Sequence, residues 1–136
     1  DLLLQTVQLI EENKTPREKQ DDNLSCYAKM LNNDNCRIDW TKSAQDIHNL
    51  VRGLNSWPVA YTTLNNKKFK IWQTRVTTGT GNPGQIIKLT KQSIIVATGE
   101  GAIELLEIQP PNKAKMPASS YINGHKQELE NNVSFI

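Results

Sequence analysis

The chain has 136 residues, of which 37% are hydrophobic and 22% charged, and its formal net charge is +2. That length suits one ordinary domain, and no apolar run approaches the roughly 18 residues that a membrane-spanning helix needs. Cys26 and Cys36 are too few for a disulfide framework, and with His48 and His125 they show no metal-ligand spacing. We therefore expect a cytoplasmic protein with no membrane association and no metal site. Because the sequence opens at Asp1 inside an apolar helical pattern, we also expect a piece of a longer protein.

Acidic and basic residues are divided unevenly along the chain. Residues 1–36 hold four Lys or Arg and seven Asp or Glu, a net charge of −3, which leaves +5 for the remainder. Residues 64–99 contain no Asp or Glu and six basic side chains: Lys67, Lys68, Lys70, Arg75, Lys88 and Lys91. Such a stretch indicates a polyanionic partner, although a solvated lysine-rich sheet face would have the same composition.

The first expected element is an amphipathic helix at the start of the chain. Leu3, Val7 and Ile10 recur at helical spacing among polar residues. Residues 13–23 then contain a proline, six charges and no large apolar side chain, which predicts a loop or linker.

A second helix is predicted to begin after Ser43. Ser43 is followed three residues later by Asp46, a variant of the capping box. One face of this helix carries the apolar side chains Ile47, Leu50, Val51 and Leu54. Trp40 and Trp57 flank the helix, and we expect both to pack between it and the rest of the domain.

From Lys68 onward the pattern changes from helical to extended. Alternating polarity and β-branched residues predict strands at 68–76, 85–90, 93–98 and 102–109. The alternation slips by one residue between Leu105 and Leu106, which indicates a β-bulge. Four or five short, bent antiparallel strands favour a small barrel and an α+β, mainly β class. A short helix at 118–124 and a polar tail ending in 133–136 should follow.

Residues 79–84 match a dinucleotide-binding motif by letter, because Gly79, Gly81 and Gly84 have the G-x-G-x-x-G spacing. That motif requires a helix to begin inside it, whereas Gly84 leads into a predicted strand, so we expect a glycine-rich hairpin loop instead. His48 and His125 have no nucleophile or acid at a useful spacing. We therefore expect no catalytic residue in this chain.

Trp72 alternates with Lys68 and Lys70 in the basic strand, so the three should share one face. It could contact a nucleic-acid base there, or it could belong to the core or to a domain interface. The acids Asp39, Glu100, Glu104 and Glu107 form no recognisable acid and base pair, and we expect them on strand exteriors or in turns.

Short motifs in a fixed order extend over nearly the whole chain. They are Tyr27-Ala-Lys-Met-Leu31, Arg37-Ile-Asp-Trp40, Asn55-Ser-Trp-Pro58, Pro83-Gly84-Gln-Ile86, Val96-Ala-Thr-Gly-Glu-Gly101, Leu105-Leu-Glu-Ile-Gln-Pro110 and Lys113-Ala-Lys-Met116. This order resembles the linker and C-terminal domain of the methionyl-tRNA formyltransferase family. One departure is Val59, which stands where the family's Trp-Pro turn usually has glycine. The family's catalytic His-x-Ser-x-Leu-Pro signature is absent.

The resemblance implies a domain organisation. Residues 1–12 would be the last helix of a missing catalytic domain, 13–36 the linker, and 37–136 an OB-like antiparallel barrel. The catalytic domain would transfer formyl from 10-formyltetrahydrofolate to initiator methionyl-tRNA, so this chain would hold no cofactor of its own.

The barrel would present a basic surface to the tRNA and would act as a monomer beside its own catalytic domain. The implied tRNA-binding residues are Lys67, Lys68, Lys70, Arg75, Lys88, Lys91, Lys113 and Lys115. Related formyltransferases share Ile38-Asp-Trp40, so a structural C-terminal domain of an enzyme acting on a nucleotide sugar or another small amine stays an alternative.

Overall fold

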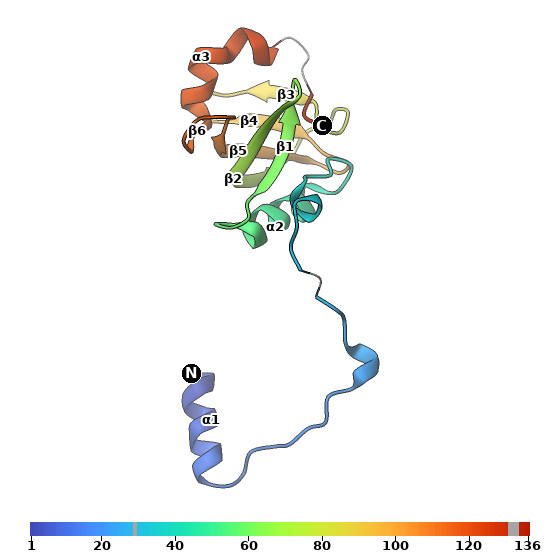
Figure 1. Ribbon diagram of the computed structural model, residues 1–136, viewed down its shortest axis with the longest axis vertical. Helices are drawn as coiled ribbons and strands as arrows, with labels where there is room; N and C mark the ends of the chain where they lie inside the picture. Colours follow the sequence, from blue (N-terminus) through green and yellow to red (C-terminus); the bar gives the residue numbers. More distant parts are fainter. Residues whose placement is uncertain (29, 131–133) are drawn as a thin grey trace. The chain divides into compact units, whose positions relative to one another are not determined.

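The computed structural model describes residues 1–28, 30–130 and 134–136, and the chain divides into two compact units, Asp1–Met30 and Leu31–Ile136. The first unit contains α1 (Leu2–Glu11) and a single-turn 3-10 helix (Asp22–Leu24), joined by extended chain (Figure 1). The predicted first helix is therefore confirmed. No residue of α1 is buried, although most of its side chains are apolar.

The second unit begins with a 3-10 turn (Asp34–Cys36) and the helix α2 (Ala44–Leu54). The predicted cap is confirmed, since the hydroxyl of Ser43 accepts from the backbone N–H of Asp46 at 3.1 Å. The predicted apolar face is confirmed as well, because Ile47, Val51 and Leu54 are buried and Leu50 packs against the same core.

Six strands form one antiparallel sheet in the second unit. They are β1 (Ala60–Leu64), β2 (Lys67–Thr77), β3 (Ile86–Leu89), β4 (Ile94–Ala97), β5 (Ala102–Gln109) and β6 (Met116–Pro117). The spatial order is β1-β2-β5-β4-β3, and β6 pairs with β5 (Figure 1). The α+β, mainly β, barrel-like class is confirmed, and the named strands curve without closing into a complete barrel.

The sequence did not predict β1, although its burial alternates with a period of two from Ala60 to Leu64. The expected hairpin at 79–84 is wrong. β2 pairs with β5, whereas β3 pairs with β4, so the glycine-rich segment is a crossover between strands that do not pair with each other. Gly79 and Gly81 lie against the side chain of Ile87, where a Cβ would clash.

The predicted bulge is confirmed in the pairing of β2 with β5. Ile71 pairs with Ile108, and Thr74 pairs with Leu105, but the register shifts twice between these pairs. Leu106 is the extra residue on β5, and Trp72 is the extra residue on β2. The two shifts compensate each other and bend both strands.

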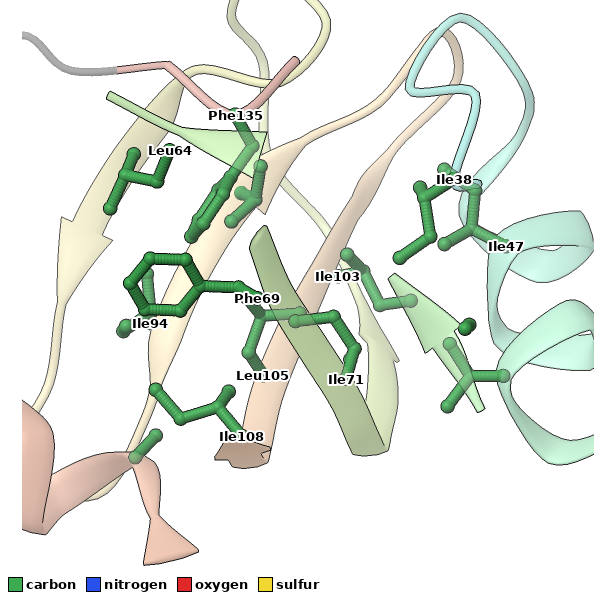
Figure 2. Close-up of a cluster of buried hydrophobic side chains, with 14 of the residues drawn as sticks. Ile38, Ile47, Leu64, Phe69, Ile71, Ile94, Ile103, Leu105, Ile108 and Phe135 are labelled. Carbon is green, nitrogen blue, oxygen red and sulfur yellow. The ribbon is translucent and has the colours of Figure 1, made fainter. Parts of the chain in front are cut away.

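The core lies on the inner face of the sheet, where Phe69, Ile71, Ile94, Leu105 and Ile108 converge (Figure 2). The helix α3 (Ala118–Glu130) covers part of this core with Tyr121, Ile122 and Leu129. It is longer than the predicted 118–124, and its helical conformation is interrupted at His125.

The segment 134–136 spans the gap between the two edges of the sheet. The N–H of Ile136 donates to the carbonyl oxygen of Thr63 at 2.9 Å, and the N–H of Thr63 donates to the carbonyl oxygen of Ile136 at 3.0 Å. Ser134 forms a β-bridge with Gln85, next to β3. The polar tail expected before 133–136 is in part helical, because α3 continues to Glu130; at its end Phe135 is 3% exposed, and 131–133 lie outside the described residues.

Phe135 belongs to an aromatic cluster in the core. Its ring stacks on Trp40, with centroids 5.7 Å apart. It meets Phe69 edge-on, with centroids 6.2 Å apart (Figure 2). The predicted burial of Trp40 is confirmed. The same prediction for Trp57 is wrong, because its side chain is 78% exposed.

Candidate nucleic-acid interface

The outward face of β2 carries the first group of predicted basic residues. Phe69 and Ile71 point into the core, so the alternation of the strand directs Lys68 and Lys70 to the outward face. Lys67 is two residues before Phe69, so alternation alone would direct it to the core face. It lies next to the β1–β2 turn, however, and is exposed.

A row of paired residues extends this outward face across the sheet. Lys88 of β3 pairs with Ile95 of β4, Ile95 pairs with Glu104 of β5, and Glu104 pairs with Arg75 of β2. Directly opposed residues in an antiparallel sheet project from the same face. The topology therefore brings Lys88 to the same face as Arg75, Lys68 and Lys70.

The remaining predicted residues lie in connections. Lys91 is exposed in the turn between β3 and β4, and Lys113 and Lys115 lie in the β5–β6 connection. The eight residues therefore extend over one face and its rim, and they do not converge on a single point.

Two carboxylates lie within this basic face. Because β5 is inserted between β2 and β4, it carries Glu104 and Glu107 into a surface whose flanking strands have no acid in sequence. Glu104 is 3.6 Å from the guanidinium of Arg75, and Glu107 is 2.6 Å from the ammonium of Lys115. Within 1–28, 30–130 and 134–136, the other six predicted residues form no ion pair.

Trp72 is half-buried at the centre of this face. Its indole N–H donates to the side-chain oxygen of Gln109 at 3.2 Å, and the ammonium of Lys115 lies 5.2 Å from the ring centroid. Tyr61 of β1 has a similar companion, because the ammonium of Lys68 lies 3.7 Å from its ring centroid. Sequence reasoning missed Tyr61 and Gln109; Tyr61 was missed because β1 was not predicted, and only the burial pattern in the structure places it on the outer face.

The two histidines have structural neighbours. The ring of His48 is within hydrogen-bond distance of the Thr74 hydroxyl, at 2.8 Å, and the ring of His125 stacks on Tyr121 with centroids 4.1 Å apart. The hydroxyl and N–H of Thr41 donate to Asp39 and hold the pKa of that carboxyl below its usual range. The described residues contain no group of His, Cys, Asp or Glu that could hold a metal ion.

Across the described ranges we find no helix with the length and apolar content needed to cross a membrane. The candidate interface is one face of the antiparallel sheet and its rim, where two of the eight predicted basic residues each form an ion pair in the described part of the chain.

Several known enzymes are similar to nearly the whole chain. Methionyl-tRNA formyltransferase of Streptococcus mutans is 44% identical over 130 residues, which make up 96% of this chain and 42% of that enzyme. The enzymes of the same name from Clostridium perfringens and Staphylococcus epidermidis are also 44% identical, over 131 and 135 residues, and 42% and 44% of their lengths are covered. The chain thus spans less than half the length of the curated relatives it matches.

Solved structures share the fold at low identity. HypX from Aquifex aeolicus superimposes with a TM-score of 0.65 and 15% identity, covering 92% of this chain and 23% of that one. HypX in complex with tetrahydrofolic acid superimposes with a TM-score of 0.61 and 17% identity, covering 90% of this chain and 22% of that one. The family model described as "Formyl transferase, C-terminal domain" matches residues 30–126. This chain therefore belongs to the formyl transferase C-terminal domain family.

Proposed function

We propose that the chain is the C-terminal, tRNA-binding part of a cytoplasmic methionyl-tRNA formyltransferase. Residues 1–12 would end its catalytic domain, 13–36 would be the linker, and 37–136 would bind initiator methionyl-tRNA as a monomer. Transfer of formyl from 10-formyltetrahydrofolate would take place on the catalytic domain. The names of the 44% identical relatives support the identity of the parent enzyme.

The observation that carries the RNA-binding role is the shared outward face of Lys68, Lys70 and Lys88. Their ammonium groups have no carboxylate partner in the described part of the chain, so binding a phosphate would not first require breaking an ion pair. Cations arranged on one face neutralise phosphates and release counterions, which supplies sequence-independent affinity. Such contacts would position the tRNA, and the choice of tRNA would be made elsewhere.

The test is binding of initiator tRNA at several salt concentrations by the wild-type chain and by Lys68→Ala, Lys70→Ala and Lys88→Ala. Each lost phosphate contact should reduce the magnitude of the log-affinity against log-salt slope by about 0.7 to 0.9. The matched control is Lys126→Ala, because Lys126 already pairs with Glu130 on α3 at 3.6 Å. Its slope should equal that of the wild type.

An unchanged slope in all three variants would show that these lysines are only a solvated surface. Absence of tRNA binding even at low salt would favour a structural domain of another formyltransferase. Turnover of methionyl-tRNA and 10-formyltetrahydrofolate by the purified chain would contradict the assignment of catalysis to another domain.

A further inference from the structure

A small hollow lies on the outward face at the junction of β2 and the β5–β6 connection. It is lined by Lys68, Lys70, Gln109, Pro110, Pro111 and Asn112 and has a volume of about 180 Å³. Sites for drug-sized molecules are larger, roughly 300 to 1,000 Å³, so this hollow suits a phosphate group better than a nucleoside. Its lining includes two lysines and no acidic residue.

The wall at Gln109 is held in place on both sides. Its side-chain oxygen accepts from the indole N–H of Trp72 at 3.2 Å, and its side-chain nitrogen donates to the carbonyl oxygen of Lys113 at 3.0 Å. Lys70 lies in register between Tyr61 and Gln109, so its stem is enclosed by a neighbour on each strand. Lys70 is therefore held beside a fixed wall of the hollow.

Tyr61 determines where the second ammonium group lies. Lys68 is exposed, and a free lysine stem would sample many rotamers, which binding would have to restrict. Its ammonium instead lies 3.7 Å from the Tyr61 ring centroid, within the range of a cation–π interaction. Because Tyr61 is half-buried and packs against the core, the ring itself is held by the domain.

We propose that this hollow binds one backbone phosphate of the RNA and that Tyr61 is the positioning residue that pre-organises Lys68 for it. The proposal rests on the RNA-binding function above and makes it specific to one phosphate, one hollow and one aromatic ring. Tyr61 makes no contact with the RNA, and its effect on affinity passes entirely through Lys68.

The first experiment is a double-mutant cycle on tRNA affinity with the whole chain. Tyr61→Leu removes the ring, Tyr61→Phe keeps it, and Lys68→Met keeps the stem without the charge. Tyr61→Leu should weaken binding about two- to fivefold in the wild-type background and have no effect in the Lys68→Met background. Tyr61→Phe should bind like the wild type.

Loss of packing alone would reduce affinity equally in both backgrounds, so equal effects of Tyr61→Leu would overturn the proposal. The position of Lys68 has its own readout, since the Cε proton signals of this residue should be shifted upfield by the tyrosine ring. That shift should disappear in Tyr61→Leu and persist in Tyr61→Phe.

The second experiment separates the hollow from the RNA-binding function. Inorganic phosphate is titrated into the chain while the Cε signals of Lys68, Lys70 and Lys126 are followed. Saturable shifts at Lys68 and Lys70, with none at Lys126, would support the hollow even if tRNA did not bind. Equal, linear shifts at all three would overturn it even if tRNA binding were strong.

Discussion

The N–H of Phe135 donates to the carbonyl oxygen of Gly84 at 2.8 Å, and the Cα of Gly84 faces the carbonyl oxygen of Phe135 so closely that a Cβ would overlap it. Gly84 also has a φ of +83°, in the left-handed region that favours glycine. Glycine at this position thus serves both the turn before β3 and the approach of the C-terminal segment to the sheet.

Gly84→Ala should lower the free energy of unfolding by at least about 2 kcal/mol, because left-handed strain adds to displacement of the Phe135 backbone. Gly53→Ala is the matched control. Gly53 lies in α2 with nothing within 4 Å of its Cβ position, so alanine there should stabilise the chain by about 0.5 to 1 kcal/mol. Urea unfolding of both variants measures the contrast, and a neutral Gly84→Ala would contradict the proposed clash.

Replacing Val59 with glycine should destabilise the chain less than replacing it with alanine. It is 4% exposed and has a φ of +74°, a conformation that costs a β-branched residue of order 1 to 3 kcal/mol. Both replacements lose the same buried branch, but alanine keeps the backbone strain, so Val59→Gly should be more stable than Val59→Ala by about 1 kcal/mol.

The control for Val59 is Val51, which is 1% exposed inside α2. Here the helix favours alanine, and Val51→Ala should be more stable than Val51→Gly by about 1 kcal/mol. Thermal unfolding of the four variants shows whether glycine or alanine is the more stable replacement at each position. The same order at both positions would show that the conformation of Val59 does not limit stability.

The ionisation of Tyr121 should weaken the fold at high pH. Burial, assisted by the negative charge of Glu128, raises the pKa of Tyr121 from 10.0 to about 12. Between these values the unfolded phenol ionises while the folded one stays protonated, so the free energy of unfolding should fall as pH rises. The expected loss between about pH 9 and about pH 11.5 is about 2 kcal/mol.

Tyr121→Phe should remove most of that loss, since phenylalanine keeps the ring without the ionisable group. Tyr27→Phe is the control, because Tyr27 is 87% exposed and its replacement should leave the wild-type pH profile. Urea unfolding at both pH values gives the comparison. If the free energy of unfolding of Tyr121→Phe falls as steeply with pH as that of the wild type, groups other than Tyr121 cause the fall.

Glu107→Gln should strengthen binding of tRNA, the opposite of the lysine variants. The change removes a negative charge from the basic face and releases Lys115, now 2.6 Å from the carboxylate. The affinity should rise about two- to fivefold at low salt, and the salt slope should steepen by up to about 0.9. Glu130→Gln, which releases Lys126 on α3, should leave the affinity unchanged; a similar increase in both variants would indicate general attraction.

Local patterns predicted the three helices and four of the strands, but missed the short strands β1 and β6. The cap at Ser43 and the bulge at Leu106 depend on neighbouring residues, so both were visible in the sequence. Residues 64–99 contain no acidic residue, but the folded surface around them does. Strand order places Glu104, which lies outside this stretch, beside Arg75. No local pattern indicates that β2 and β3, which follow each other across the glycine-rich segment, pair with β5 and β4 and not with each other.

The role of Phe135 was equally hidden, since the four residues 133–136 are too few to show a periodicity. Its burial results from a gap between β1 and β3, which exists only after the sheet has folded. The hollow at Lys68 has the same origin, because its lining comes from β2, the end of β5 and the β5–β6 connection. Non-local sites of this kind follow from the fold, and composition alone indicates no more than the sign of their charge.

The segment 134–136, which spans the gap between β1 and β3, also sets an order of events for a chain still being synthesised. A ribosome completes all six strands before it adds Phe135, and until then Thr63 and Gly84 lack their backbone partners. The rings of Trp40 and Phe69 likewise wait for a side chain 66 or more positions downstream. Contacts of such long sequence separation form slowly, so the nascent domain should remain open between β1 and β3 until residues 134–136 have emerged.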